Sequence, residues 1–384
     1  MEVFVVSITL IMAAISLTPA VLGAERDHHN ILWTLKAFYR SANFKLVLFI
    51  FFCVTFGLKV AAEFGDGVVP LIEYMDGTTI DSGLHFVGKG SKLQVIGAGF
   101  VVAALFSWFG FLASDKRGEK VIYLLLSATP IVFGIAKTSK LDIFEVVLYY
   151  FIAFYYWRRF SGTKVYFARA FVILTILGSG MALLTTVRLN VAEVNLATLV
   201  FDANWPEFVI YPFDEILSVL YGYTALNFDN LYRFLARSDS EYHLGSSVFR
   251  PLFSMLMSGD IPRQMTEGVD MYGFIDSAVG TFIRDVYFEG GPGLCIFAAI
   301  LYSTAINYIY YRFRRGGGST FLVTYMFFAF PWTWLVFQNA FGSLSIYVNM
   351  FYAILLVNIG LRIVKPRKAA NRQTNSIGQG KEAM

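Results

Sequence analysis

Long runs of apolar residues, separated by shorter polar segments, follow one another along almost the whole chain. The hydrocarbon core of a bilayer is about 30 Å thick, so a spanning helix needs roughly 20 mostly apolar residues. A helix also satisfies its own backbone hydrogen bonds where lipid offers none. The pattern therefore predicts an all-α, polytopic membrane protein with about nine transmembrane helices and a large external loop. The stretches are about 3–23, 46–62, 93–113, 121–136, 142–157, 170–187, 291–311, 320–338 and 345–363.

The first stretch has the length of a signal peptide but not its flanks. Its N-terminal region carries Glu2 and no Lys or Arg, and the possible cleavage site within 21–24 has a large residue three positions back. Secretory signals have a basic start and a small-residue cleavage site. We therefore expect a retained transmembrane helix.

Composition supports lipid as the main solvent of the chain. Of the 384 residues, 57% are apolar and 15% are charged, with 39 Phe, and the mean hydropathy is +0.59. A water-soluble fold of this size needs more polar cover, so a soluble enzyme, a disordered scaffold and a nucleic-acid-binding module are excluded. Cys53 and Cys295 lie in or beside apolar runs, which argues against a disulfide framework or a thiolate metal site. We expect no metal and no cofactor.

The positions of Lys and Arg predict the orientation. The segments 24–45, 114–120, 158–169, 312–319 and the tail from 362 hold 20 of the 31 basic residues. Alternation of nine helices places all five segments on one face, and basic loops stay in the cytoplasm. The sequence therefore predicts an external N-terminus and a cytoplasmic C-terminus.

Four regions follow from this topology. Residues 1–187 form about six N-terminal spans with a glycine-rich external loop at 63–92. Residues 188–290 form a large periplasmic loop, and such long loops are usually functional. Residues 291–363 form about three C-terminal spans. Residues 364–384 form a basic cytoplasmic tail whose polar composition is typical of disorder.

The large loop contains amphipathic segments. Residues 209–221 place apolar side chains on one helical stripe opposite acidic ones, 228–237 repeat this pattern, and a third short helix is expected from Pro251 to Gly259. Such helices lie in the membrane interface rather than across it. The loop is therefore expected to cover the outer membrane surface as a lid.

Basic residues in this loop are all arginines. The guanidinium forms a rigid bidentate fork that suits phosphate oxygens, as in a lipid-linked pyrophosphate. Arg233 and Arg237 also fit a structural role, because Asp229 lies at i,i+4 from Arg233, and Arg188 could equally anchor a helix end. The candidates for pyrophosphate or glycan binding are Arg188, Arg250, Arg263 and Arg284.

Candidate proton acceptors lie near the end of the loop. The segment 281–293 contains Arg284, Asp285 and Glu289, followed by glycines that allow close approach of the backbone to a ligand. The alternative is an ordinary turn in which Glu289 complements a helix N-terminus. His243 is a possible general base or a simple surface histidine.

Charges inside the expected spans are few. Asp142 and Glu145 open the fifth stretch beside Lys137 and Lys140, and Lys59 can extend its amine to the interface. Ion-coupled carriers usually need charges near the bilayer midplane. This pattern argues against a transporter.

The topology and the segment Tyr287-Phe288-Glu289-Gly290 with Gly293 resemble the Wzy-type O-antigen and oligosaccharide repeat-unit polymerases. Members of this family have a large outer loop late in the chain and enter a late span through an aromatic, acidic and glycine-containing stretch. The resembling part is mainly 188–300. The histidine signature of the related O-antigen ligases is absent.

The resemblance implies a membrane glycosyltransferase of surface polysaccharide synthesis in the bacterial inner membrane. A glycan on undecaprenyl pyrophosphate would be transferred to another lipid-linked repeat unit, with Asp285, Glu289 or His243 as the base. Its partners would be the lipid-linked oligosaccharide, membrane lipid, and a chain-length regulator and flippase, with no nucleic acid. The alternatives are a flippase or exporter of the same glycan, and an O-antigen ligase.

Overall fold

The computed structural model describes residues 7–15, 29–65, 67–75, 92–163, 282–315, 318–334 and 344–379. Within these ranges the chain is all-helical and contains no strand. Five helices are long and apolar enough to cross a membrane: Ala42–Phe64, Val95–Ala113, Arg117–Ala136, Glu289–Arg314 and Leu344–Val364. The expectation of an all-α membrane protein is therefore confirmed at this level.

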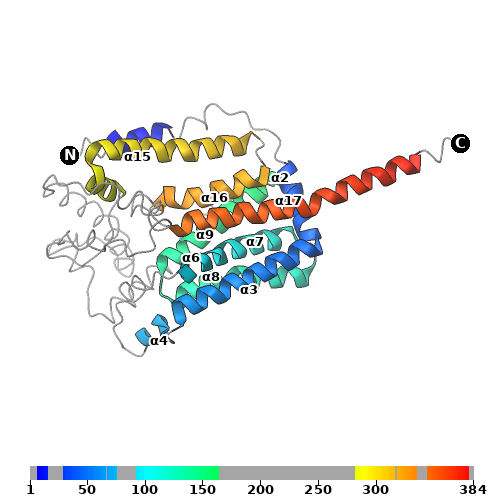
Figure 1. The fold of residues 1–384 in the computed structure, drawn as a ribbon, viewed down its shortest axis with the longest axis horizontal. Coiled ribbons are helices and arrows are strands. Elements are labelled where there is room, and N and C mark those ends of the chain that lie inside the picture. The colour runs from blue at the N-terminus through cyan, green and yellow to red at the C-terminus, as the bar shows by residue number, and fades with distance from the viewer. Residues whose placement is uncertain are drawn as a thin grey trace.

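The helices form an elongated bundle whose long members run side by side (Figure 1). Apolar runs of this length form helices because each residue then satisfies its backbone groups internally. The elements are α2 (His29–Arg40), α3 (Ala42–Phe64), α4 (Pro70–Met75), α6 (Lys92–Gly97), α7 (Gly99–Ala113), α8 (Arg117–Ala136), α9 (Lys140–Phe160), α15 (Phe282–Arg314), α16 (Gly318–Trp334) and α17 (Leu344–Gln379).

The other four of the nine expected spans are not among these five candidate membrane helices. α9 and α16 belong to the bundle, but α9 carries charges in both its first and last turns and α16 has only 17 residues. The first expected span is helical over 7–15, and the stretch 170–187 lies outside the described residues. Nine spans therefore stay a prediction.

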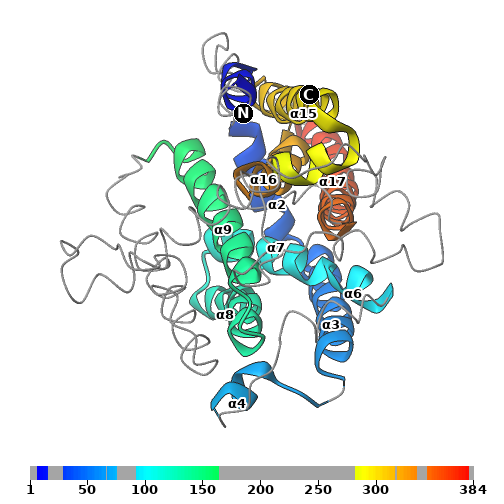
Figure 2. The same ribbon diagram turned by 90° about the vertical axis from the view of Figure 1, so that its left-hand side faces the viewer.

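α7 is the most buried of the long helices and lies at the centre of the bundle (Figure 2). Its side chains contact α3 on one side and α8 on the other. The position of Gly110 permits the second contact, because a Cβ there would lie 2.8 Å from the Tyr123 ring. A helix surrounded by other helices can be apolar on all faces, which explains why no polar stripe marks this span in the sequence.

Aromatic contacts and a few side-chain hydrogen bonds connect the helices around α7. The Trp108 and Tyr150 rings stack with centroids 5.1 Å apart, and the Trp108 indole N–H donates to the Tyr150 carbonyl oxygen over 3.1 Å. The Tyr150 hydroxyl in turn donates to the Ser127 carbonyl oxygen over 2.6 Å. Buried Trp and Tyr usually find such acceptors, so these residues fix how α7, α8 and α9 pack.

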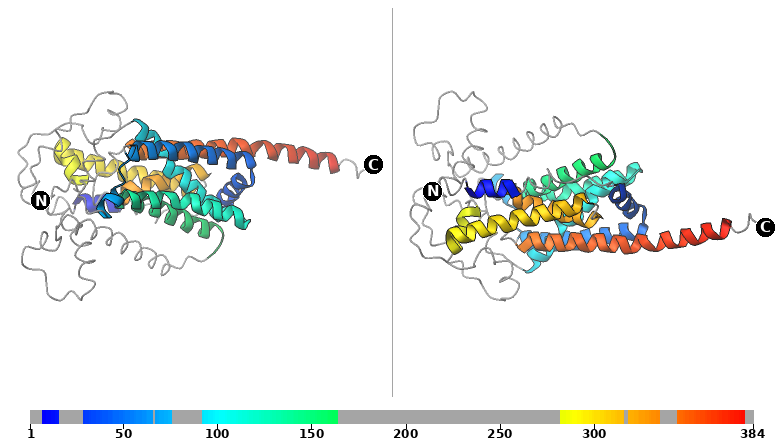
Figure 3. Two further views of the ribbon diagram at one scale, coloured as in Figure 1. Left: turned by 90° about the horizontal axis from the view of Figure 1, so that it is seen from below. Right: turned by 90° about the horizontal axis from the view of Figure 1, so that it is seen from above.

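α2 covers one end of the bundle (Figure 3). Its residues Ile31, Leu35 and Phe38 are buried in the main core, and the Tyr39 hydroxyl donates to the Phe106 carbonyl oxygen of α7. Sequence analysis assigned 24–45 only as a basic cytoplasmic segment. The segment instead forms an amphipathic helix whose apolar side packs against the ends of the long helices.

α17 continues beyond the bundle (Figure 1). It begins at Leu344, close to the expected start of the ninth span, but extends to Gln379 instead of ending near residue 363. The helix therefore includes most of the 364–384 tail that composition assigned as disordered. Good helix formers such as Ala, Arg, Lys and Gln follow Pro366 and are compatible with this continuation.

Charge divides the two ends of the bundle. We call the end where α9 and α15 finish and α8 begins the basic end. Its only described acids are Asp115 and Glu119. Its described bases are Lys36, Arg40, Lys45, Lys116, Arg117, Lys120, Arg158, Arg159, Arg312, Arg314, Arg315 and Arg362.

Candidate functional site

The helix α15 is broken near its start, at the end of the bundle opposite the basic end (Figure 1). Gly290 has φ −156° and ψ 21°, and Gly291 has φ 64° and ψ −160°, so neither is helical. The second combination is essentially restricted to glycine. Pro292, which lacks an N–H, then begins the long part of the helix. The glycines of the 281–293 segment thus separate a short helical piece, 282–289, from the span.

The short piece is held by apolar packing. Phe282, Ile283 and Val286 are buried against Cys295 of the span and Ile8 of the N-terminal helix. Across the break, the Cys295 thiol donates a weak hydrogen bond to the Ile283 carbonyl oxygen over 3.5 Å. Both sides of the break are therefore fixed by packing, so its geometry does not depend on the glycines alone.

Glu289 lies at the break and is completely buried, with 0% exposure. It is the last residue before the non-helical Gly290, which places a carboxylate inside the protein where the backbone changes direction. Burial of a carboxylate costs several kcal/mol in solvation, and buried ionisable groups are therefore candidates for a functional role. Of the sequence-predicted acids and bases, Glu289 is the one whose side-chain burial is described.

The other predicted site residues are placed less completely. Arg284 and Asp285 lie on the short helical piece, in the same two turns as Glu289, but their side chains are not described. Residues 164–281 lie outside the described residues, and they include Arg188, His243, Arg250 and Arg263. The structure therefore brings Arg284, Asp285 and Glu289 into one segment and leaves the rest of the proposed site untested.

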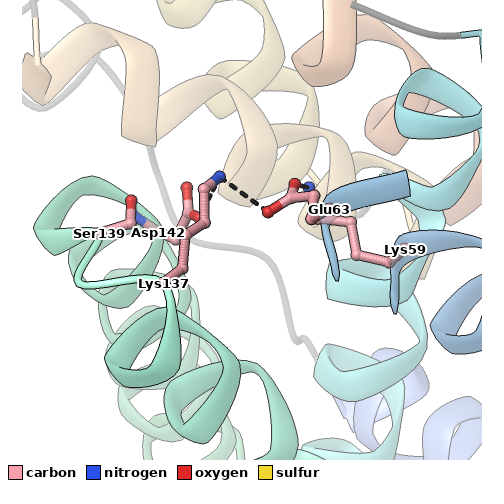
Figure 4. A network of polar contacts seen from close by, with 5 residues as sticks. All are labelled: Lys59, Glu63, Lys137, Ser139 and Asp142. Carbon is pink, nitrogen blue, oxygen red and sulfur yellow. Dashed lines mark hydrogen bonds and ion pairs between the residues drawn. The ribbon is translucent and has the colours of Figure 1, made fainter. Parts of the chain in front are cut away.

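A second group of charges, which we call the charge network, joins α3 to the α8–α9 connection (Figure 4). Glu63 is 1% exposed and forms an ion pair with Lys59 in its own helix. It forms a second ion pair with Lys137, and the distance from the Lys137 Nζ to the Glu63 Oε2 is 3.0 Å. Lys137 also lies 3.1 Å from the Asp142 carboxylate. One ammonium group thus links two carboxylates on two different helices.

The backbone around the charge network supports this arrangement. Ser139 is the N-cap of α9, and its hydroxyl accepts from the Asp142 backbone N–H over 3.3 Å. Lys137 follows the last turn of α8, where a cation complements the helix dipole. Burial alone would lower the pKa of Lys137, but the Asp142 and Glu63 carboxylates outweigh it and raise this pKa above its ordinary value.

Glu145 extends the polar group towards α16. Its carboxylate accepts from the Tyr149 hydroxyl over 2.9 Å, and the Tyr149 ring packs on Phe327 with centroids 4.6 Å apart. The next residue of α16, Phe328, packs instead against the cluster around Val286 and Cys295. The charge network and the broken start of α15 therefore lie on two sides of α16.

Sequence analysis placed Glu63 in the external loop 63–92, whereas it lies in the last turn of α3. The signal that could have located it is the i,i+4 spacing from Lys59, which favours an ion pair on a continuing helix. The Lys137–Asp142 contact joins two residues that sequence analysis had noted as neighbours. What the pattern of residues could not show is that Glu63 reaches the same lysine.

The described charges do not form a compact metal site. No group of three or more His, Cys, Asp or Glu side chains that could hold a metal ion occurs within the described ranges. In the charge network, ammonium groups occupy the position next to the carboxylates that a cation would take. The charge network is suited to fixing the helices that it joins.

Comparison with protein-family models, with curated proteins and with solved structures found no match to this chain.

Proposed function

We propose that the protein is a membrane glycosyltransferase that polymerises oligosaccharide repeat units carried on undecaprenyl pyrophosphate. The observation that carries the proposal is the buried Glu289 carboxylate at the glycine-broken start of α15. This segment ends the large arginine-containing loop 188–290, and most of the described Lys and Arg residues lie at the opposite end of the bundle. By the positive-inside rule the broken end then faces outward.

The reaction needs two kinds of protein group. The acceptor sugar hydroxyl attacks the anomeric carbon of the donor glycan, and the bond from that carbon to the pyrophosphate oxygen breaks. Undecaprenyl pyrophosphate leaves with the bonding electrons, while the hydroxyl proton passes to a general base. We assign the base to Glu289, with Asp285 and His243 as the other candidates. Arg188, Arg250, Arg263 and Arg284 would stabilise the negative charge that develops on the leaving group.

The proposal also fixes a place and partners for the protein. It would lie in the bacterial inner membrane with about nine spans, an external N-terminus and a cytoplasmic C-terminus. Its substrates would reach the site from the outer leaflet after a flippase has moved them. A chain-length regulator would act on the product, and no metal or other cofactor takes part in this scheme.

The direct test is incubation of the purified full-length protein with one lipid-linked repeat unit. We expect products of two and more units, resolved as a ladder by gel electrophoresis or mass spectrometry. If the folded wild-type protein makes no product longer than one repeat unit, the polymerase proposal is refuted.

The site assignment needs a separate variant. Glu289→Gln keeps the size of the side chain but removes the base, so we expect the ladder to disappear while the protein remains folded. Glu73→Gln in α4 is the matched control, because it removes one carboxylate of partial exposure elsewhere on the described chain. If both variants are as active as the wild type, Glu289 is not the base, but the proposed function is not refuted.

An exporter or flippase of the same lipid-linked glycan is the second candidate, and the charge network favours it. Lys59 and Glu63 lie inside a candidate membrane-spanning helix, and ionisable residues within spans often mark transport pathways. Movement of a lipid-linked glycan across liposomes containing the protein, without chain extension, would support this candidate. Transfer of the glycan to a lipid A acceptor would instead identify an O-antigen ligase.

A further inference from the structure

The charge network and the adjacent Glu145 together contain more described carboxylates than described ammonium groups (Figure 4). The acids are Glu63, Asp142 and Glu145, and the bases are Lys59 and Lys137. Glu63 and Asp142 lie 3.0 Å and 3.1 Å from the Lys137 ammonium group, and Glu63 also pairs with Lys59. Glu145 is therefore the acid whose charge has no described counter-ion in contact with it.

The carboxyl group of Glu145 has one polar partner among the described side chains. Its Oε1 accepts a hydrogen bond from the Tyr149 hydroxyl over 2.9 Å. An ionised carboxylate can accept about four hydrogen bonds, so one neutral donor satisfies only a small part of this capacity. The donor side is also closed to water, because Tyr149 is completely buried and its ring packs on Phe327 and Phe330 of α16. These surroundings favour a neutral carboxylic acid over a carboxylate.

The helices packed against α9 bring no further described base to Glu145. α7 contains no ionisable side chain, and α16 contains only Tyr325, which lies near Tyr156 towards the basic end. The described bases of α2 and of the first turn of α8 belong to the basic end itself. Lys140 begins α9 five positions before Glu145, on a different face of the helix. The charges next to Glu145 are therefore those of the charge network, and Asp142, one turn before it, disfavours a second negative charge there.

Two polar groups beside the charge network are suited to the entry of a proton. The Asp142 side chain is 32% exposed. The Thr138 hydroxyl, next to Lys137 in the α8–α9 connection, is buried and has no hydrogen-bond partner among the described residues. Buried polar atoms of this kind are usually satisfied by ordered water. Water bound in the connection would carry protons between the surface and the charge network.

We propose that Glu145 is a proton-binding site, in which Oε2 carries the proton while Oε1 keeps the hydrogen bond from Tyr149. The bound proton leaves two carboxylates for two ammonium groups, which is the less costly state for ionisable groups removed from water. Proton binding and the ionic link between α3 and α9 then depend on each other, because an ionised Glu145 repels Asp142 and competes for Lys137. This proposal rests neither on the polymerase nor on the exporter candidate.

The test is infrared spectroscopy of the purified full-length protein in neutral detergent at pH 6. An ordinary glutamate has a pKa of about 4.3 and is therefore about 98% ionised at this pH. We expect the difference spectrum of wild type minus E145Q to contain the C=O stretching band of a protonated carboxylic acid, identified by its shift in D2O. A difference spectrum that contains only carboxylate bands would show that Glu145 is ionised and would overturn the proposal.

The matched control is E73Q, which removes a half-buried carboxylate of α4 that lies outside the charge network. We expect the difference spectrum of wild type minus E73Q to contain carboxylate bands and no band of a protonated acid. Loss of the same protonated-acid band in E73Q and in E145Q would show that the band does not report on Glu145, and this result would also overturn the proposal.

Unfolding in mixed micelles with increasing dodecyl sulfate distinguishes Glu145 from Glu63. E145Q replaces a neutral acid by a neutral amide of the same shape, so we expect the unfolding midpoint of the wild type at pH 6. E63Q removes a charge that pairs with Lys59 and Lys137, so it should unfold at a lower dodecyl sulfate concentration. Equal losses in the two variants would show that Glu145 is ionised like Glu63 and would contradict the proposal.

D142N covers the case in which E145Q does not fold. This variant removes the like charge one turn before Glu145 and therefore makes an ionised Glu145 less costly. During alkaline titration, we expect the protonated-acid band to disappear at a lower pH in D142N than in the wild type. An unchanged titration midpoint would show that the protonated acid is not part of the charge network, and the site would be refuted.

Discussion

Replacement of Lys137 by methionine tests whether the charge network holds α3 against the α8–α9 connection. Methionine keeps much of the length of the side chain but removes the ammonium group that links Glu63 and Asp142. Glu63, only 1% exposed, would keep Lys59 as a partner, whereas Asp142 would lose its lysine. The change therefore removes one interaction in a buried setting and one in a partly exposed setting.

The expected magnitude follows from these two settings. Breaking a buried ion pair by removing one partner costs about 3–5 kcal/mol, and the remaining Lys59 places this case at the lower limit. The Asp142 side chain is 32% exposed, so its pair adds roughly 0.2–1 kcal/mol at most. We expect the free energy of unfolding to fall by about 3 kcal/mol in K137M.

The assay is unfolding in mixed micelles with increasing dodecyl sulfate, followed by circular dichroism. K116M is the control, because Lys116 is 82% exposed and lies 3.9 Å from Glu119, so its loss should cost no more than about 1 kcal/mol. A cycle with E63Q should show coupling of about 1–3 kcal/mol between Glu63 and Lys137. If K137M is as stable as K116M, or the two substitutions are additive, the reasoning about the charge network is wrong.

Three further predictions concern the break in α15, the centre of the bundle and pH. Gly291→Ala should lower the free energy of unfolding by roughly 1–3 kcal/mol in the same micelle assay, because a side chain is strained at φ 64° and ψ −160°. Gly110→Val should cost about 1–3 kcal/mol through the contact with Tyr123, while Gly118→Ala, which has open space, should cost much less; equal losses would contradict the packing argument. The pKa of Lys137 is raised, so its ion pairs are fully present below the unfolded lysine pKa of about 10.4 and are lost only as pH rises through the higher folded value. The stability difference between wild type and K137M should therefore stay constant from about pH 6 to about pH 9, and a decline within that range would refute the raised pKa.

The candidate site was predictable only where one segment contains its residues. The glycines after Glu289 are visible in the sequence, and they lie where the helix breaks. The complete burial of Glu289 was not visible, because burial depends on which distant residues pack around this part of the chain, as Ile8 and Phe328 do around Val286 and Cys295. The same holds for Glu63, whose partner Lys137 lies 74 positions later in the sequence.

For the arginines at the basic end, too, the sequence predicted one property and the tertiary structure decided another. Their number and their location after apolar stretches predict which loops share one face of the membrane. That the ends of α9 and α15 approach each other follows from the contact between Tyr156 and Phe313. No spacing in the sequence relates α9 to α15, because the helices that pack together are chosen by the shapes of their side chains.

The sequence by itself determined the helical class, the candidate spans at 46–62, 93–113, 121–136, 291–311 and 345–363, and the gathering of basic residues in alternate loops. These properties are local, since each depends on the length and polarity of one stretch in contact with lipid or water. The tertiary structure decided the central place of α7, the packing of α2 under the bundle, the burial of Glu289 and the bridge from Glu63 to Lys137. These depend on which helices become neighbours. In a bilayer that choice is made by close packing and by pairing of polar groups, because lipid already solvates the apolar side chains.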